Sequence, residues 1–383
     1  MPNELDNLRG EIDRIDEELV ALFTRRMRVA ESVAAYKKEN GLPVLTPGRE
    51  RALLARVSEL AGEEMADYTA ALYRTILSAS RSWQNACLDG SSRTWDTVQR
   101  ALAETPQLFP QRPTVACQGI EGAYSQVACD SLFKAPMILF FRSFENVFQA
   151  VESGMCRYGV LPVENSSAGS VNAIYDLMLS HNFSIVRSAR LKVSHNLLAL
   201  PGVRLEDVRQ IYSHEQALSQ CAGFLSTLRD VKLTVVENTA VAARTVAESG
   251  NRHAAALSSR FCAEHYALEI LRENVQDQDN NYTRFLCIAR EPEIYPGADR
   301  SSFMMTLPHR PGSLYNVLGK FYALGINLLK LESRPLPERD FEVMFYFGFE
   351  ASVYAPELRR LFRDLESECE TFRYLGSYSE VIV

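Results

Sequence analysis

Most features of secreted, metal-binding and membrane proteins are missing from this 383-residue sequence. The eight cysteines contain no close pair and the six histidines form no HExxH pattern or Cys-His cluster, so we expect neither a disulfide framework nor a metal site. No apolar run approaches the roughly 18 residues that a membrane-spanning helix needs, and the polar start MPNELDNLRG predicts no signal peptide. These absences favour a cytoplasmic protein whose cysteines are small core residues in a reducing environment.

Positive charge is also scarce. The 41 lysines and arginines are outnumbered by 48 aspartates and glutamates, which gives a formal net charge of −7. Nucleic-acid-binding proteins normally carry a basic surface, so we expect no nucleic-acid partner. If the substrates are anions, a local cluster of arginine and lysine must bind them within an acidic protein.

The pattern of apolar residues changes twice along the chain and predicts three domains. Residues 1–90 show helical periodicity alone, and we expect three helices there. The first ends at the sequence GLP (residues 41–43), the second covers about 47–60 and the third about 67–88. The segment 89–112 is rich in proline near its end and is interpreted as a linker.

The rest of the chain predicts two domains that contain strands. Residues 113–291 alternate short β runs with helical runs, which favours an α/β domain with a mostly parallel sheet. A second linker, EPEIYPGADR, follows. Residues 300–383 have the βαββαβ order of a ferredoxin-like α+β domain. We therefore expect a multidomain protein with an all-α, an α/β and an α+β domain in that order.

The first predicted helix carries one apolar seam with a single gap. The seam residues recur at steps of three and four: Leu5, Leu8, Ile12, Ile15, Leu19, Leu22, Val29 and Val33. The missing position is Arg26, and an arginine on an apolar seam is costly unless it has a partner or a ligand. The alternative is that Arg26 extends past the seam to solvent or pairs with a nearby glutamate.

Two other basic residues on this helix favour the ligand. Lys37 lies about three turns beyond Arg26 on the same face, and Arg9 lies roughly 25 Å away toward the other end. No small metabolite can touch Arg9 and Arg26 within one chain. Two chains packed antiparallel along the seam would bring Arg9 of one to Arg26 and Lys37 of the other, so we predict a homodimer or a larger homo-oligomer.

This helical segment resembles the all-helical class of chorismate mutase. The resemblance is carried by LRGEID, TRRMRVAESVAAYKK, GRER and SRSWQ. It implies that Arg9 and Arg26 hold the two carboxylates of chorismate, and that Lys37 and Gln84 donate hydrogen bonds to its ether oxygen. The residues that complete the pocket are Arg49, Glu50 and Ser80. The rearrangement to prephenate is pericyclic, so it needs a compact substrate and well-aimed donors, and no cofactor is expected.

Polar residues gather at the ends of three predicted strands of the α/β domain. YGVLPV is followed by ENSSAGS, IYSH leads into a helix that carries Gln216 and Gln220, and NNYTRF opens a buried strand. One asparagine or serine could simply cap a helix, but the first segment has five polar residues. Ligands of open α/β sheets bind at strand ends, so these segments predict a cleft. The turn QGIEG lacks the third glycine of a dinucleotide fingerprint, so we expect no NAD.

The same segments resemble prephenate dehydratase. The matches are GAYSQ at 122–126, LPVENSSAG at 161–169, YSHEQALSQC at 212–221 and NYTRF at 281–285. The resemblance implies two α/β lobes like those of a type II periplasmic binding protein, with the site between them. It implies that Thr283 is the residue most essential to catalysis and that Arg284 stabilises the site or binds a carboxylate. The other residues implied to line the site are Glu164, Asn165, Ser213, His214 and Gln220.

The dehydratase reaction removes CO₂ and a ring hydroxyl from prephenate to give phenylpyruvate. Aromatisation drives this reaction, so the enzyme has only to help hydroxide leave through a general acid or a strong hydrogen-bond donor. Thr283 is too weak an acid to donate a proton unaided and is interpreted as an orienting donor. The group that protonates the leaving oxygen stays open between a water molecule and Glu164.

The C-terminal segment resembles the ACT regulatory domain through HRPGSLYNVL at 309–318 and LESRP at 331–335. The resemblance implies that L-phenylalanine binds between paired domains as an allosteric inhibitor, with tyrosine as the alternative effector. Gly312 would let the ligand approach the backbone at a helix start, and Glu332 would meet its ammonium group. The other interpretation of ESRP is an ordinary strand exit. The residues expected to bind phenylalanine are Gly312, Ser313, Leu314, Glu332, Ser333 and Arg334.

The three resemblances cover nearly the whole chain and predict a bifunctional enzyme of phenylalanine biosynthesis, an isomerase and a lyase in one chain. Two alternatives stay open. One is a non-catalytic regulator that combines a solute-binding-like domain with an amino-acid sensor. The other is an enzyme that dehydrates arogenate, which has an amino group where prephenate has a keto group.

Overall fold

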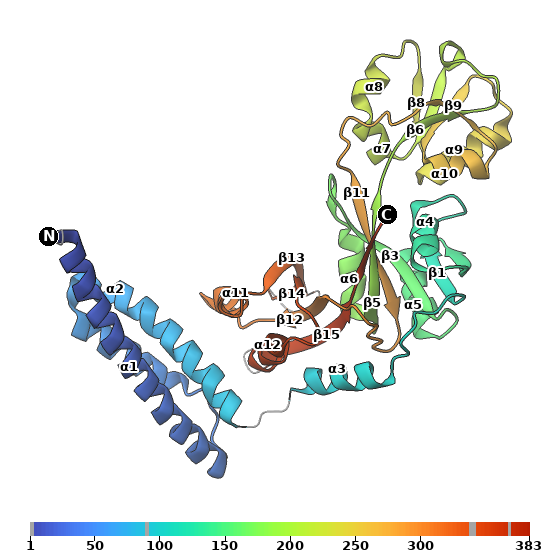
Figure 1. Cartoon of the computed structure of the whole chain (residues 1–383). Coiled ribbons are helices and arrows are strands. Elements are labelled where there is room, and N and C mark those ends of the chain that lie inside the picture. The colour runs from blue at the N-terminus through green and yellow to red at the C-terminus, as the bar shows by residue number, and fades with distance from the viewer. Residues whose placement is uncertain (1–3, 89–91, 337–341, 367–368) are drawn as a thin grey trace. The chain divides into compact units, whose positions relative to one another are not determined.

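The structure is a computed structural model that describes residues 4–88, 92–336, 342–366 and 369–383. The chain forms two compact units, and each is described by itself (Figure 1). The first consists of Met1–Asp96, Leu307–Gly325 and Ala355–Thr371. The second consists of Thr97–Thr306, Ile326–Tyr354 and Phe372–Val383. No helix within the described ranges is long and apolar enough to span a membrane.

The first unit is built from helices. Helix α1 (Glu4–Glu39) packs along α2 (Pro47–Cys87). The second and third predicted helices form this single element, which is interrupted only at Gly62 with φ 74° and ψ 168°. Glycine adopts this positive φ without the steric cost that a Cβ would bring. The unit also contains α11 (Ser313–Ala323) and α12 (Pro356–Glu366), and Asp364 of α12 accepts a hydrogen bond from Ser82 of α2.

The second unit contains the two α/β lobes. The sheet of the first lobe has the order β16-β5-β11-β3-β1-β2, with β4 beside β3. Its strands are β1 (Thr114–Gln118), β2 (Met137–Phe141), β3 (Tyr158–Asn165), β4 (Gly169–Ser170), β5 (Ser184–Lys192), β11 (Tyr282–Ala289) and β16 (Glu380–Ile382). Its helices are α4 (Tyr124–Leu132), α5 (Phe144–Glu152) and α6 (Asn172–Ser180). Residues 285–289 of β11 are all buried, because this strand is covered on both faces.

The sheet of the second lobe has the order β10-β6-β9-β7-β8. Its strands are β6 (Asn196–Ala199), β7 (Gln210–Ser213), β8 (Lys232–Val235), β9 (Ala254–Ser258) and β10 (Glu269–Arg272). Its helices are α7 (Glu215–Gln220), α8 (Ala222–Ser226), α9 (Thr239–Ser249) and α10 (Arg260–His265), with a 3₁₀ turn at Leu205–Asp207. The chain enters this lobe after β5 and returns through β11, so β11 begins where the two lobes meet (Figure 1).

The C-terminal strands form a third sheet with the order β13-β14-β12-β15. They are β12 (Arg300–Thr306), β13 (Asn327–Pro335), β14 (Val343–Glu350) and β15 (Thr371–Tyr378). We call this the C-terminal sheet. Met304 and Tyr346 from this sheet share one hydrophobic core with Leu286 and Ile288 of β11. After β15 the chain leaves the C-terminal sheet, and β16 pairs in parallel with β5 of the first lobe.

The expected fold classes are confirmed, but three details differ. The sheets of the lobes are mixed rather than mostly parallel, because β11 runs antiparallel to both β3 and β5 and β6 runs antiparallel to β9. The predicted linker 89–112 contains the helix α3 (Arg93–Glu104), which buries Val98 and Ala101. The strands β4, β6, β10 and β16 were not predicted. Parts of the predicted segments at residues 89–91, 341 and 367–368 lie outside the described residues.

Candidate active site

The polar residues that open β11 form a hydrogen-bonded network with the end of β3. The side-chain amide of Asn165 donates to Thr283 Oγ1 at 3.0 Å and to Asn281 Oδ1 at 2.7 Å. The amide oxygen of Asn165 accepts from the backbone N–H groups of Ser167 and Ala168, both at 3.0 Å. These four bonds fix the amide in one orientation. Because Thr283 Oγ1 accepts the bond from Asn165, its hydroxyl proton stays available for a ligand.

The network continues into the second lobe. Asn281 Nδ2 donates to Gln220 Oε1 at 3.0 Å, and His195 Nε2 lies 3.0 Å from the same oxygen. An amide oxygen can only accept, so His195 Nε2 carries the proton. Burial lowers the pKa of His195, the bond to Gln220 opposes part of this shift, and the imidazole is neutral at pH 7. We call these five residues the Thr283 network: Thr283, Asn165, Asn281, Gln220 and His195.

Thr283 and Arg284 are consecutive in β11 and therefore point to opposite faces of the sheet. The alternation is visible further along the strand, where Phe285 and Cys287 pack in the core beside α4. Leu286, by contrast, packs in the core that includes the C-terminal sheet. Thr283 therefore lies on the α4 face, whereas Arg284 lies on the face covered by the C-terminal sheet.

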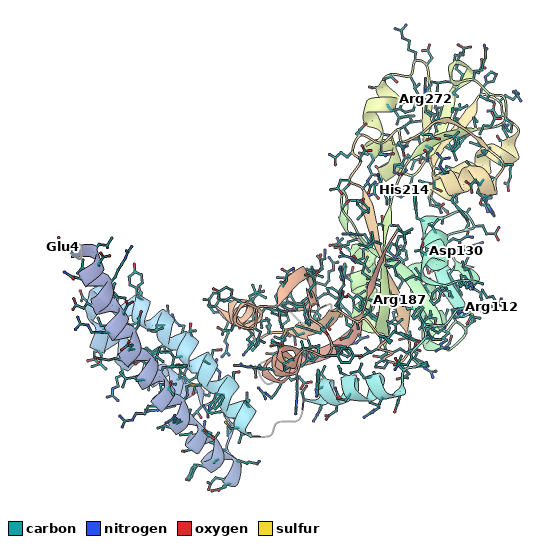
Figure 2. All side chains as sticks on the ribbon, viewed as in Figure 1. Glu4, Arg112, Asp130, Arg187, His214 and Arg272 are labelled. Atoms are coloured by element: carbon teal, nitrogen blue, oxygen red, sulfur yellow. The ribbon has the colours of Figure 1, made fainter. Side chains whose placement is uncertain are left out.

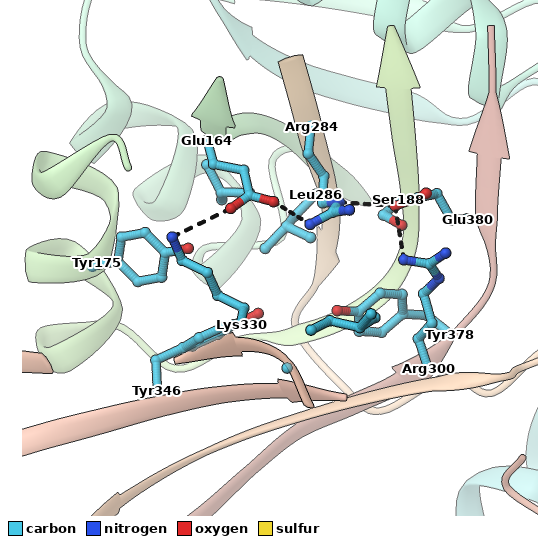
Figure 3. A pocket seen from close by; sticks show the side chains of 13 residues that line it. Glu164, Tyr175, Ser188, Arg284, Leu286, Arg300, Lys330, Tyr346, Tyr378 and Glu380 are labelled. Atoms are coloured by element: carbon cyan, nitrogen blue, oxygen red, sulfur yellow. Dashed lines mark hydrogen bonds and ion pairs between the residues drawn. The ribbon is translucent and has the colours of Figure 1, made fainter. Parts of the chain in front are cut away.

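Arg284 is paired with two carboxylates on that face (Figure 3). Its Nη1 bonds to Glu164 Oε1, and its Nε donates to Glu380 Oε1 at 2.8 Å. Burial by itself would lower the pKa of Arg284, but Glu164 and Glu380 together raise it, so the guanidinium stays charged. The sequence predicted that Glu164, Arg284 and Thr283 form one cluster. In the structure, Glu164 and Arg284 lie on one face of the sheet and Thr283 lies on the other.

The charged face reaches the Thr283 network through Asn165, at the ends of β3 and β11. A pocket there is lined by Glu164, Asn165, Ser166, Arg190, Asn280, Tyr282 and Arg284. A second pocket lies between β11 and the C-terminal sheet and is lined in part by Glu164, Arg284, Lys330, Tyr346 and Tyr378 (Figure 3). Glu164 and Arg284 line both pockets, so this ion pair separates the pocket at the strand ends from the pocket beside the C-terminal sheet.

Ser213 and His214 hold the turn that leads to Gln220. Ser213 is fully buried, and its hydroxyl donates to the Leu257 carbonyl at 2.8 Å. His214 caps α7 by accepting from the Gln216 N–H at 3.3 Å, and in Figure 2 it lies at the end of the second lobe nearest the first. Neither side chain is hydrogen-bonded to the Thr283 network among the described residues. They support the turn from which Gln220 reaches the network.

In the helical unit, the predicted chorismate-binding residues include buried atoms without partners. Ser80 and Gln84 are buried one turn apart, and Gln84 Nε2 donates to Ser80 Oγ at 3.3 Å. Arg26 Nη1 and Gln84 Oε1 are also buried, and neither has a hydrogen-bond partner in the described part of the chain. An unpaired buried polar atom costs free energy, so these two atoms favour a bound ligand.

The other members of this set have local partners or are exposed. Lys37 Nζ donates to the Val44 carbonyl at 2.6 Å, and Glu50 pairs with Arg81 at 2.6 Å. The exposed members are Arg9 and Arg49. The apolar seam of α1 is also exposed in the single chain, as Leu19 at 53% illustrates.

The residues predicted to bind phenylalanine fall in both units. In the first unit, Gly312 has a φ of 85° at the start of α11, and Ser313 Oγ donates to the Pro308 carbonyl at 2.7 Å. Leu314, the next residue of α11, is partly buried. The positive φ explains the glycine, because other residues adopt this conformation only with strain.

In the second unit, two residues of ESRP contact the first lobe. Glu332 accepts a hydrogen bond from Ser170 of β4, and Arg334 pairs with Asp176 of α6 at 2.6 Å. Ser333, between them, is exposed. These contacts lie where the C-terminal sheet meets the first lobe.

Four residues of these clusters were given no role from the sequence: His195, Asn281, Lys330 and Glu380, of which only Asn281 was noted, as a polar residue at the start of the strand. Asn281 is two residues before Thr283 and so shares its face of the strand, which the alternation could have revealed. The other three belong to no recognised motif and come close only through the fold. No group of three or more His, Cys, Asp or Glu side chains within the described ranges is arranged to hold a metal ion.

Comparisons with known proteins agree with this architecture. The prephenate dehydratase family model matches residues 115–293, and the chorismate mutase type II model matches residues 8–85. The arogenate dehydratase/prephenate dehydratase 2 of Arabidopsis thaliana is 40% identical over 279 residues, which is 70% of this chain and 73% of that protein. The crystal structure of an Arthrobacter aurescens prephenate dehydratase in complex with L-Phe has a TM-score of 0.64 at 25% identity, covering 70% of this chain and 90% of that one.

Some relatives match from end to end. The bifunctional chorismate mutase/prephenate dehydratase of Aquifex aeolicus (strain VF5) is 30% identical over 386 residues, which is 99% of both proteins. The helical unit and the two-lobed region correspond to the two activities in that name. This chain therefore belongs to the bifunctional chorismate mutase/prephenate dehydratase family.

Proposed function

We propose that the Thr283 network is the dehydratase site of this enzyme. The observation that carries the proposal is the fixed amide of Asn165, which donates to Thr283 Oγ1 and leaves the hydroxyl proton free. A fixed donor at the end of a buried strand suits a reaction whose difficult step is the departure of hydroxide. The Gln220 Nε2 group, which makes no hydrogen bond among the described residues, is a second donor.

The reaction can be followed through its bonds. The ring carboxylate leaves as CO₂, and the electron pair of its C–C bond enters the ring as the ring C–O bond breaks. One proton is taken up by the departing oxygen, so that water leaves and phenylpyruvate remains. Thr283 orients this oxygen, while neutral His195 keeps the Gln220 amide in place. Because Glu164 is ion-paired with Arg284 and Lys330, the proton comes from a water molecule in the pocket that Glu164 and Asn165 line.

The same pocket contains positively charged side chains that suit the anionic substrate. Arg190 and Arg284 put two guanidinium groups on its wall beside Glu164. Arg284 is already paired closely with Glu164 and Glu380, whereas the ion pair of Arg190 Nε with Glu380 is longer, at 3.9 Å, and the Arg190 side chain is 41% exposed. Arg190 is thus available to a substrate carboxylate, and Arg284 serves mainly to stabilise the site.

For the mutase, we propose a site shared between two copies of the chain. The unpaired Arg26 Nη1 and Gln84 Oε1 and the exposed seam of α1 support this arrangement. A second helical unit laid antiparallel on the seam would bury it and supply Arg9 to the opposite chain. The rearrangement needs only carboxylate anchors and donors at the ether oxygen, and Arg26, Lys37 and Gln84 are of the required types.

For regulation, we propose feedback inhibition by L-phenylalanine through the C-terminal domain. A dehydratase relative binds this amino acid in its crystal structure, as its name states. Within the first unit, the left-handed Gly312 at the start of α11 supports the proposal, because it lets a ligand approach the backbone closely.

One assay tests these proposals together. Purified protein is given chorismate, and phenylpyruvate is measured with and without L-phenylalanine. Formation of phenylpyruvate that falls on addition of L-phenylalanine is the expected result. Accumulation of prephenate would contradict the dehydratase site while leaving the mutase intact. Rates on prephenate and arogenate, measured side by side, separate the two dehydratase substrates, since an Arabidopsis relative is named for both.

A further inference from the structure

The last residues of the chain are part of the dehydratase region. Strand β16 pairs with β5 over Glu380–Ile382, and the backbone N–H of Val383 donates to the Arg190 carbonyl at 3.0 Å. Just before it, Gly376 of β15 lies so close to β5 that a Cβ there would be 2.1 Å from the Ile185 carbonyl oxygen. The C-terminal segment is therefore closely fitted to the sheet that carries the Thr283 network.

This fit places the Glu380 carboxylate among three guanidinium groups. The Glu380 side chain is only 2% exposed. Its oxygens lie 2.8 Å from Arg284 Nε, 3.1 Å from Arg300 Nη1 and 3.9 Å from Arg190 Nε. A buried carboxylate is tolerated only when it is paired, and here its partners are two arginines of the lobe sheet and one of the C-terminal sheet. Removal of its charge would leave Arg284 with Glu164 alone.

Lys330, a residue of the C-terminal sheet, contacts the other member of the Glu164–Arg284 ion pair. Lys330 of β13 places its Nζ 3.3 Å from Glu164 Oε2 and 3.3 Å from Glu332, and it donates to Ser170 Oγ at 2.6 Å. The Lys330 side chain is 19% exposed, so it is not a freely solvated surface lysine. Figure 3 shows the resulting row of charges from Lys330 through Glu164 and Arg284 to Glu380.

We propose that Lys330 and Glu380 are positioning residues for the dehydratase reaction. They act through Glu164 and Arg284, whose side chains they hold at the wall of the pocket beside Asn165 and Arg190. Without Lys330, Glu164 turns toward Arg284 alone, and without Glu380, Arg284 is drawn toward Glu164. Each change moves a charged group at the edge of the substrate pocket. This inference rests on the dehydratase site proposed above and adds to it one residue of the C-terminal sheet and one of the last strand of the first lobe's sheet.

The test uses the full-length chain and the variants Glu380→Gln and Lys330→Met, which keep the approximate size of each side chain. The kcat/KM for prephenate is expected to fall at least tenfold in each variant, with most of the loss in kcat. Mutase activity in the same preparations is expected to stay within twofold of wild type. The matched controls are Glu291→Gln and Lys192→Met, which change exposed residues of the same unit and are expected to stay within twofold.

Two further variants separate positioning from a merely structural role. Lys330→Arg keeps the charge and is expected to recover most of the activity lost in Lys330→Met. Combined with Glu164→Gln, Lys330→Met is expected to cause no more than a twofold further loss, because its effect passes through Glu164. The proposal would be overturned if the activity losses of Lys330→Met and Glu164→Gln multiplied in the double variant. It would also be overturned if Lys330→Met and Glu380→Gln each kept dehydratase activity within twofold of wild type. If Glu164→Gln itself leaves dehydratase activity unchanged, the role of Glu164 in the proposed site fails first, and the two failures are thereby distinguished.

Discussion

The two proposed sites, the Thr283 network and the chorismate-binding residues of the helical unit, differ in how many of their buried polar groups find a hydrogen-bond partner within one chain. In the Thr283 network, both N–H groups and the oxygen of the Asn165 amide are hydrogen-bonded, and Asn281 in turn donates to Gln220. In the helical unit, Arg26 Nη1 and Gln84 Oε1 are buried without a partner among the described residues, and the seam beside them is exposed. The donors of the proposed dehydratase site are therefore ordered within one chain, whereas the proposed mutase site needs a ligand and a second copy of the chain to pair its buried atoms.

The largest expected effect comes from Thr283→Ala, which removes the donor at the centre of the complete network. Dehydratase kcat should fall by about 10² to 10⁴-fold, as for loss of a positioned proton-handling group. Mutase activity should not change, because its residues lie in the other unit. Steady-state kinetics on prephenate and on chorismate check both statements.

Thr283→Ser should retain much more activity, since it keeps the hydroxyl, and Thr227→Ala is the exposed control. Equal loss of both activities in Thr283→Ala would show that the two sites are not independent. The contrast between the sites would then have no functional meaning.

The second-largest effect is expected from Arg26→Ala in the proposed mutase site, where the described part of one chain leaves buried polar atoms unpaired. Mutase activity should fall by about 10² to 10³-fold, as when one preorganised donor is lost from an electrostatic site. Dehydratase activity on added prephenate should stay the same. Arg28→Ala, an exposed arginine of the same helix, is the control.

Complementation sharpens this prediction. Inactive Arg9→Ala and Arg26→Ala chains, mixed and reassembled, should regain part of the mutase activity, because one of the two shared sites then contains both arginines. Verified heterodimers without any recovery would mean that each chain carries its own complete mutase site.

A third prediction concerns the fit of the C-terminal segment. Gly376→Ala would put a Cβ 2.1 Å from the Ile185 carbonyl oxygen at a φ of 146°, so the strand must shift. The cost is expected to be about 2–4 kcal/mol, the range of overpacking and backbone strain combined. Thermal inactivation of the dehydratase should occur at a lower temperature than in wild type, while the mutase inactivates as before.

Gly250→Ala is the matched control for that change. It has a φ of 62° but nothing within 4 Å of a Cβ, so it carries the backbone strain without the clash. Equal shifts in the two variants would show that β15 and β5 are not closely fitted.

The smallest effect is a pH dependence from His195. Burial lowers its pKa in the folded chain below the ordinary value of 6.5, so the unfolded chain binds more protons between those two values. Stability is then complete above pH 6.5 and is lost as the pH falls toward the folded-state pKa. In His195→Gln this part of the pH dependence should disappear. Thermal midpoints of both proteins from pH 5 to pH 7.5 check it, and parallel curves would contradict it.

Much of this protein was predictable because local rules act on neighbouring residues. Helical periodicity predicted α1 and the gap at Arg26, and the string NNYTRF predicted a polar entry to a buried strand. Motif matches placed Thr283, Asn165 and Gln220 in one site, and the hydrogen bonds connect them. Because consecutive residues of a strand point to opposite faces of the sheet, the sequence also implied that Thr283 and Arg284 lie on different faces, which was not predicted.

The sequence by itself determined the three fold types, the helical seam and the residue types of both sites, since these depend on periodicity and on contiguous motifs. Only the tertiary structure decided which charges meet. Arg284 bonds to Glu380, 96 residues away, and Lys330 reaches Glu164 from the C-terminal sheet. The physical reason is that ion pairs have no sequence period: they depend on which strands lie side by side, and here the three-residue strand β16 crosses from the C-terminal sheet to the edge of the lobe sheet.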